Sequence, residues 1–280
     1  MSKGISPARG AALLAAAVLL FALFAYLLFP TGRIDTVIAR LLEPQGLTLS
    51  PPVHKTILPG LAWDNLLLSS GQGPLVSCDR LQLRPLLLPL LLARAVISGK
   101  AAFGSGKMEL DYALNGREAL DFTADDIKLS EIPFFKSVLG ATSSGVFWSR
   151  GKLLRDAKGL NGEFKLEVRQ LGFSGVKLGS FPLPDAEGLK TQGMIRVVDG
   201  QARLESLTLE GDGIYMRLSG DLPSGANAGV TPLNMTLEIM PKAEFIEKQK
   251  LVFLLLVKFM TSPGVYKLPI RGTLLKPVIL

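Results

Sequence analysis

Apolar and polar residues alternate along much of the chain, in short runs that are separated by glycine. The run Phe164–Arg169 has the sequence Phe-Lys-Leu-Glu-Val-Arg, and the same alternation recurs at 107–114, 214–219 and 233–239. Successive side chains of a β-strand point to opposite faces of the sheet, so each run predicts a strand with one apolar and one polar face. The chain is therefore predicted to be mainly β.

Turn signals lie between these runs, at the spacing of consecutive antiparallel strands. Asn115-Gly116 and Asp199-Gly200 are the clearest hairpin candidates, because both central residues of the favoured two-residue turn need a positive φ. Further turns are predicted at Gly104–Gly106, Asn161-Gly162 and Gly211–Gly213. We expect a curved antiparallel sheet, formed as one long meander with a single apolar face.

Three short helical segments are predicted within the meander, at Pro85–Ala93, Ser130–Gly140 and Pro241–Lys258. A sheet must bury its apolar face against another layer, and these helices are a thin layer for so many strands. Two outcomes stay open. The sheet can curl into a closed or half-closed barrel with a packed core, or it can leave an apolar groove that takes a ligand with an acyl chain.

If the sheet is open, the apolar positions of its C-terminal strands are the predicted lining of the groove. The uncharged run Leu251–Val257 is too short to cross a bilayer, so we expect it to cover one end of the groove as a lid. The predicted lipid-contacting residues are Met216, Leu233, Met235, Leu237 and Ile239 on the strands, with Leu254 and Leu256 on the lid.

The N-terminal segment has a different pattern, because residues 10–32 carry no charge and Ala11–Phe29 is an unbroken run of 19 apolar residues. About 20 such residues span the roughly 30 Å hydrocarbon core of a bilayer as a helix. A cleaved signal peptide is the main alternative, but bulky residues stand where a small-residue cleavage site is needed. We expect a retained, single transmembrane helix.

This interpretation divides the chain into a cytoplasmic head at 1–9, a transmembrane anchor at 10–32 and a β-rich domain at 33–280. The Lys/Arg bias that sets orientation is slight, since Lys3 and Arg9 precede the run and Arg33 and Arg40 follow it. A long trailing domain is exported largely regardless of its charge, whereas the short head has nothing to export. The domain is therefore expected outside the cytoplasm, next to a membrane.

The net charge of +7 is compatible with an anionic membrane surface or with nucleic acid. Basic residues are interleaved with acidic ones, as in Lys165–Arg169, and no basic stripe rich in aromatic residues is present in the sequence. We therefore expect no nucleic-acid partner. The single cysteine, Cys78, cannot form an intramolecular disulfide.

Candidate chemistry is sparse, and we predict no catalytic, cofactor-binding or metal site. His54 is the only histidine, which excludes a site rich in histidine and favours an ordinary strand position. Gly104–Lys107 resembles the end of a phosphate-binding loop but lacks its first glycine and its Ser/Thr, so a hairpin turn explains it better. Asp121, Asp125 and Asp126 have no nearby acid/base partner in the sequence and are interpreted as a polar strand end.

A resemblance to a known family adds what the chemistry does not. The run Tyr266–Pro277 resembles the closing strand of the type II secretion system protein N family, and its Gly-Thr-Leu ending is similar to that of AsmA-like proteins. The segment Pro59–Leu61, the Leu/Pro helix after Leu81–Pro85 and the run Asp126–Pro133 are also similar to the secretion family. These motifs are loose patterns of strands and turns.

The resemblance implies a bacterial inner-membrane protein with a single span and a periplasmic C-terminal domain. The secretion family implies an assembly or structural role in type II protein secretion, with other subunits of that machinery as partners. The AsmA-like kinship implies an alternative, in which the sheet holds phospholipid acyl chains and serves the outer membrane. Neither implication involves an enzyme or a cofactor, and phospholipid is an expected partner in both.

Overall fold

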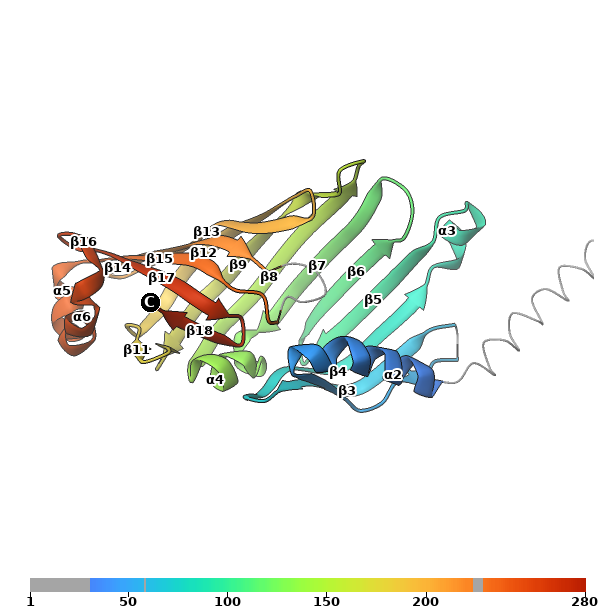
Figure 1. Ribbon diagram of the computed structural model, residues 1–280, viewed down its shortest axis with the longest axis horizontal. Coiled ribbons are helices and arrows are strands. Elements are labelled where there is room, and N and C mark those ends of the chain that lie inside the picture. Colours follow the sequence, from blue (N-terminus) through green and yellow to red (C-terminus); the bar gives the residue numbers. More distant parts are fainter. Residues whose placement is uncertain (1–30, 58, 224–228) are drawn as a thin grey trace, which may run out of the picture.

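One large antiparallel sheet forms the body of the protein in a computed structural model, which describes residues 31–57, 59–223 and 229–280 (Figure 1). Nearly every strand pairs with its neighbours in the sequence, in the order β1-β3-β4-β5-β6-β7-β8-β9-β12-β13-β14-β15-β17-β16. Two further strands extend this sheet at its edges, since β2 pairs with β3 and β18 pairs with β17. The predicted long meander is confirmed.

The first half of the sheet contains eight strands. Their bounds are β1 (Leu47–Ser50), β2 (His54–Lys55), β3 (Leu61–Ser70), β4 (Gly73–Pro85), β5 (Val96–Phe103), β6 (Gly106–Ala113), β7 (Glu118–Lys128) and β8 (Thr142–Arg155). The second half contains β9 (Leu160–Ser174), β12 (Ala186–Val198), β13 (Gln201–Gly211), β14 (Ile214–Leu222), β15 (Asn234–Pro241), β16 (Met260–Ser262), β17 (Val265–Thr273) and β18 (Lys276–Ile279). A separate small hairpin is formed by β10 (Lys177–Leu178) and β11 (Phe181–Pro182).

The sheet curves but does not close. Among the described strands, β1 and β2 at one edge make no pairing with β16 or β18 at the other edge. A fully closed barrel, one form of the first outcome left open by the sequence, is therefore excluded for the described strands. Short edge strands limit the exposed backbone at both margins, which restricts pairing with other chains.

The helices are short, as predicted. Pro85–Ala93 contains α3 (Leu87–Leu91), and Ser130–Gly140 contains α4 (Phe134–Leu139), which ends at Gly140 in the left-handed conformation. A short 3-10 turn, η2 (Leu129–Glu131), precedes α4.

The third predicted helix, Pro241–Lys258, is divided in the structure. It consists of α5 (Ala243–Lys248), α6 (Lys250–Leu256) and the 3-10 turn η3 (Val257–Phe259). Gln249 separates the two helices with a non-helical ψ of 37°, and its side chain instead makes two hydrogen bonds to the backbone of Asp185. This tertiary contact between residues 64 positions apart cannot be predicted from a local pattern.

The helix α2 (Thr31–Leu42) was not expected from the sequence. It begins within the last two residues of the predicted anchor segment 10–32 and continues along the sheet margin near β3 and β4 (Figure 1). A 3-10 turn, η1 (Glu43–Gln45), follows it. The rest of the predicted anchor and the head lie in residues 1–30, outside the described part. Within the described ranges, no helix has the length and apolar character needed to cross a membrane.

A turn or bend is found at four of the five predicted positions, although the connection at Asn115-Gly116 spans 114–117 and only Gly116 of the two has a positive φ. Asp199 and Gly200 join β12 to β13, and both have the positive φ that the turn requires, 52° and 81°. The predicted turn at Asn161-Gly162 is wrong, because both residues lie inside β9. The chain turns earlier, at 156–159, where the Asp156 carboxylate accepts hydrogen bonds from the backbone N–H groups of Lys158 and Gly159.

Candidate functional site: an apolar trough on the inner face

Strand register places one row of mainly apolar positions across the concave face of the sheet. Directly paired residues of an antiparallel sheet share a face, so a chain of pairs can be followed from strand to strand. From β4 to β12 the row contains Leu83, Gly99, Leu110, Phe122, Gly151, Phe164 and Ile195. We call these seven residues the trough floor.

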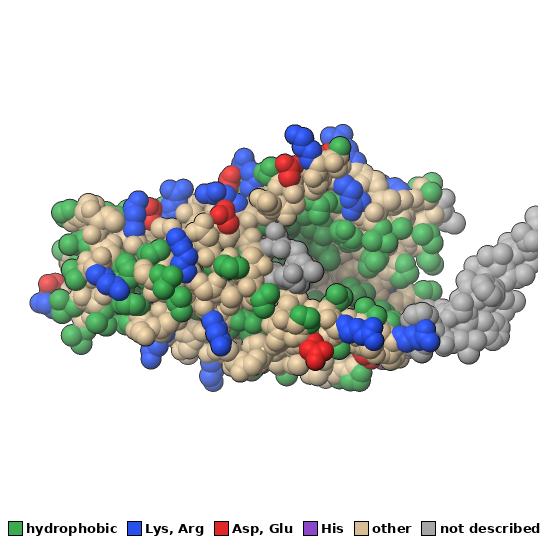
Figure 2. Space-filling model, viewed as in Figure 1, with side chains coloured by type: hydrophobic (Ala, Val, Ile, Leu, Met, Phe, Trp, Pro, Cys, Tyr) green, Lys and Arg blue, Asp and Glu red, His purple; other side chains and the backbone are tan. Residues whose placement is uncertain are grey.

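The large side chains of the trough floor are only half-buried, although they are apolar. Figure 2 shows a hollow on this face, with hydrophobic side chains inside it and along its margins. Leu83 and Phe122 border a buried cluster that contains Trp63, Phe103 and Ile127. The trough floor is thus the uncovered margin of a core.

Two glycines shape the trough floor. Phe122 and Phe164 make an edge-to-face contact, with ring centroids 5.9 Å apart and an interplanar angle of 67°. Between them on β8 lies Gly151, where an added Cβ would stand 2.0 Å from Cδ1 of Phe164. The Phe164 ring therefore occupies the place that a side chain at 151 would take. Gly99 has the corresponding place between Leu83 and Leu110.

The opposite face of the same strands is polar and its charges are paired across strands. Lys100 contacts Glu109 at 3.1 Å, and Lys152 contacts Asp121 at 2.9 Å. Further pairs on this face are Arg80–Asp64, Arg196–Glu205, Arg203–Asp221 and Lys267–Glu238. Such exposed pairs contribute little to stability, but they define which face is adapted to water.

The helix α2 forms a wall beside the trough. Ile34 and Ile38 pack against the cluster that contains Trp63, and the Asp35 carboxylate accepts a 2.9 Å hydrogen bond from the N–H of Val53. Val37 and Leu41 belong to the same apolar stripe but stay 55% and 59% exposed. A pocket of about 490 Å³ lies between α2 and the segment 47–52.

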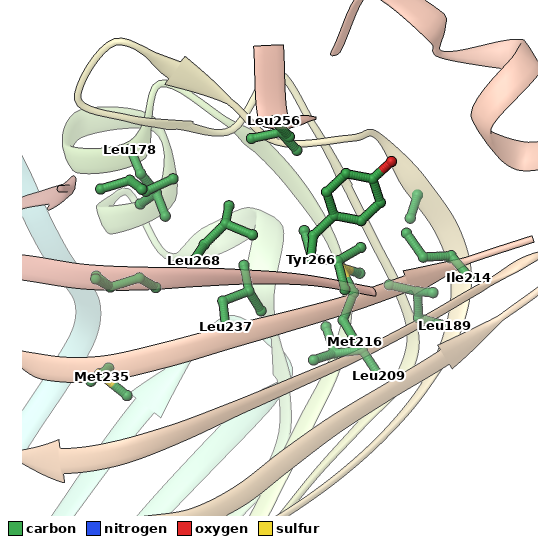
Figure 3. Close-up of a cluster of buried hydrophobic side chains, with 14 of the residues drawn as sticks. Leu178, Leu189, Leu209, Ile214, Met216, Met235, Leu237, Leu256, Tyr266 and Leu268 are labelled. Atoms are coloured by element: carbon green, nitrogen blue, oxygen red, sulfur yellow. The ribbon is translucent and has the colours of Figure 1, made fainter. Parts of the chain in front are cut away.

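The residues predicted to contact lipid lie elsewhere, in the C-terminal half of the sheet. Met216, Leu233, Met235, Leu237, Ile239 and Leu256 are all buried and belong to one packed cluster. Figure 3 shows Met216, Leu237 and Leu256 in this cluster, beside Tyr266 and Leu268. In this conformation the six residues form a core rather than a surface, and their contact with acyl chains stays a prediction.

The predicted lid is only partly a cover. Leu256 and Phe253 of α6 are buried against the cluster, but Leu254 is 59% exposed and points away from it. In this conformation only Leu256 of the two packs against the cluster, and lipid contact by Leu254 and Leu256 stays a prediction. Residues 254 and 256 are 200° apart on a helix, so one helix cannot turn both toward the sheet.

The trough floor was missed, although its signal was present in the sequence. Leu110 belongs to the predicted strand run 107–114, and Phe164 to the run Phe164–Arg169. Alternation identifies the inner face, but it is equally strong where that face is covered and where it is open. The missing information was the position of the covering segments.

No catalytic constellation accompanies the trough. His54 lies on β2 and contacts Asp64 at 3.4 Å on the polar face, opposite to the trough floor. Asp121 lies within β7 and is paired with Lys152, while Asp125 and Asp126 belong to an irregular part of the same strand. Gly104–Lys107 belongs to a hairpin, as predicted: Gly104 and Ser105 form the turn between β5 and β6, and Gly106 and Lys107 begin β6. Among the described residues, no group of three His, Cys, Asp or Glu could hold a metal ion.

The pKa values that depart from their usual range are explained by structure. Burial in the cluster around Trp63 raises the pKa of the Cys78 thiol, with a smaller contribution from Asp79. The pKa of Lys152 is raised by its hydrogen bond to Asp121. A raised pKa makes Cys78 a poor nucleophile, as in an ordinary buried cysteine.

Comparisons with known proteins add no relative. No protein-family model matches the chain, and neither the search of curated proteins nor that of solved structures finds a match. The resemblance to the type II secretion system protein N family therefore remains a prediction from the sequence.

Proposed function

We propose that the protein binds acyl chains of phospholipid in its apolar trough, beside a membrane to which its N-terminal segment tethers it. The observation that supports this most is the row of half-buried apolar side chains from Leu83 to Ile195, on the face opposite to the charge-paired one. Exposure of an extended apolar surface to water is unfavourable, so such surfaces usually bind a ligand or a partner.

The dimensions of the trough floor suit an acyl chain. Seven neighbouring strands spaced about 4.8 Å apart give a row roughly 29 Å long. One acyl chain spans about half of a bilayer core, or roughly 15 Å. The row therefore has length for an extended acyl chain along it, and Gly99 and Gly151 let the neighbouring Leu83 and Phe164 side chains lie close to the backbone.

The second candidate is a structural role in type II protein secretion, at the periplasmic side of the inner membrane. It rests on the resemblance of Tyr266–Pro277, which forms β17 and the start of β18 at the covered end of the sheet. This segment is distant from the trough floor along the strand order, so the two roles can be tested separately.

A photo-crosslinking experiment in cells tests acyl-chain binding. The crosslinker p-benzoylphenylalanine replaces Phe122 on the trough floor and, as a matched aromatic control, Trp148 on the polar face, which pairs with Glu167. Both side chains are half-buried, so exposure does not distinguish them. We expect phospholipid to be captured from position 122 and not from position 148.

Met235 is the control for the effect of burial, because it lies in the same row of directly paired residues. It continues the trough floor into the C-terminal half but is only 7% exposed. A crosslinker there is expected to capture residues of the same chain. Equal lipid capture from positions 122 and 148 would contradict the proposal, and so would capture of protein alone from position 122.

Purification of the detergent-solubilised full chain, followed by mass spectrometry of its lipids and proteins, separates the two candidates. Co-purified phospholipid that is lost on replacing Leu110 and Phe122 by glutamine supports the trough. Secretion subunits that remain bound to this variant support the assembly role. If neither lipid nor subunits are recovered with the unaltered chain, both proposals are contradicted.

A further inference from the structure

The connection between β4 and β5 carries a dense group of exposed apolar side chains. It contains α3, and residues 85–93 have no charge. Four of its leucines are 59%, 79%, 53% and 78% exposed: Leu87, Leu88, Leu90 and Leu92. Four exposed leucines within six consecutive residues form a patch that marks an interaction site.

The position of α3 identifies the surface that it meets. In Figure 1, α3 and the first turn of α2 lie at the same end of the long axis. The apolar run Ala11–Phe29 ends two residues before Thr31, where α2 begins. The membrane that this run is predicted to cross therefore lies at the end of the molecule that carries α3.

One more exposed apolar residue lies at the end of the molecule that carries α3. Ile57, in the connection between β2 and β3, is fully exposed. Leu61 at the start of β3 pairs with Leu83 near the end of β4, so this connection lies at the same strand ends as α3. Two separate connections thus present apolar side chains in the direction of the predicted membrane.

The charges around α3 fit a bilayer surface. Arg84 precedes the uncharged segment 85–93 and Arg94 follows it, and Arg94 contacts Glu118 at 3.2 Å. Arginine side chains can lie at the level of lipid headgroups while neighbouring leucines enter the acyl region. Leucines at the tip of a connection can reach the depth of about 5–10 Å at which interfacial helices bury their apolar faces.

We propose that α3 inserts into the interface of the bilayer in which residues 11–29 are anchored, and so gives the domain a second membrane contact. The proposal does not depend on lipid binding in the trough. The helix α6, which also carries exposed leucines, lies at the opposite end of the long axis, so a bilayer that crosses this axis at the α3 end does not contact it (Figure 1). Leu251 of α6 is 79% exposed, as is Leu88 of α3, which makes it a matched control.

The test uses the full chain with Cys78→Ala and one new cysteine, either Leu88→Cys or Leu251→Cys. Each is labelled with an environment-sensitive nitrobenzoxadiazole dye and reconstituted into vesicles of phosphatidylethanolamine and phosphatidylglycerol. Spin-labelled phospholipid and iodide then serve as quenchers from the lipid and water sides. We expect the lipid quencher to act at least about threefold more strongly on the dye at position 88, and iodide to act more strongly at position 251.

Three results would overturn the proposal. The first is equal quenching of both positions by iodide, which places α3 in water. The second is equal quenching of both by the spin-labelled lipid, which means that the domain lies flat on the membrane. The third is failure of the full chain to float with the vesicles, which shows that the protein does not associate with a membrane.

Discussion

The two halves of one row on the concave face differ in exposure although they share residue types and strand geometry. Leu110 on β6 is half-buried, whereas Leu204 on β13 is only 3% exposed. Both belong to the same sequence of direct pairs, since Ile195 pairs with Phe164 on one side and with Leu204 on the other. The comparison teaches that facing inward does not by itself bury a side chain in an open sheet.

Covering segments account for the difference. Over the C-terminal strands, the packed cluster includes side chains from four separate elements: Leu178 of β10, Phe253 and Leu256 of α6, Ile279 of β18 and Leu129 of η2. The N-terminal strands have α2 along one margin, through Ile34 and Ile38. Along this row the C-terminal half is therefore covered, whereas the N-terminal half is open beside the buried cluster that contains Trp63.

The largest expected effect comes from placing a charge on the covered half. Leu237→Asp puts an unpaired carboxylate at a position that is 6% exposed, so we expect a loss of about 4 kcal/mol or more in the free energy of unfolding. Leu110→Asp, half-buried in the trough, should lose about 1–2 kcal/mol because its carboxylate can reach water. Urea denaturation followed by circular dichroism measures both.

Thr236→Asp is the control for strand position, because Thr236 lies on the polar face and pairs with Ser219. We expect a change within about 1 kcal/mol. Equal losses for Leu237→Asp and Leu110→Asp would mean that the two halves are equally covered in solution.

A smaller effect is expected from cavity formation at matched leucines. Leu204→Ala should cost about 3 kcal/mol, because the buried side chain leaves a space that its neighbours fill only partly. Leu110→Ala should cost about 1 kcal/mol, since part of its side chain is already in contact with solvent. A difference below about 0.5 kcal/mol in urea denaturation would contradict the division into core and trough.

The shape of the trough floor can be changed at its glycines. Gly151→Ala forces the Phe164 ring to move, and we expect a loss of about 1–3 kcal/mol together with weaker lipid co-purification. At Gly99, an added Cβ would meet only the flexible end of Leu83, at 3.1 Å. Gly99→Ala should therefore stay within about 0.5 kcal/mol of the unaltered protein. If the two variants behave alike in thermal denaturation, Phe164 is not held over Gly151.

The smallest effect concerns the rim of the open half. Backbone N–H groups of Lys158 and Gly159 lower the pKa of Asp156 below its usual value of about 3.9. A lowered pKa in the folded state means that the stabilisation is present above the unfolded value and is lost as pH falls through the folded one. The melting temperature of Asp156→Asn should be slightly below that of the unaltered chain at neutral pH. The gap should close in acid, and a gap that widens in acid would contradict this assignment.

Much of the fold was predictable from local pattern. The alternating runs at 107–114, 164–169, 214–219 and 233–239 lie in strands apart from their end residues Leu114 and Leu233, because successive side chains of a strand alternate between its two faces. Asp199-Gly200 specified a turn for a similar reason, since its backbone conformation depends on the residues themselves. Gly162 was misjudged because a glycine within a strand gives the same signal as one in a turn.

The candidate site was decided by tertiary structure. Alternation predicted the inner face correctly for Met235, Leu237 and Ile239, and the same signal is present at Leu110 and Phe164. Whether such a face becomes a core or a trough depends on where η2, α6 and β18 pack, and these segments contact it from distant points of the sequence. The sequence by itself determined which side chains share a face, because that follows from backbone geometry. Only the tertiary structure decided which of them are covered, because burial depends on long-range packing.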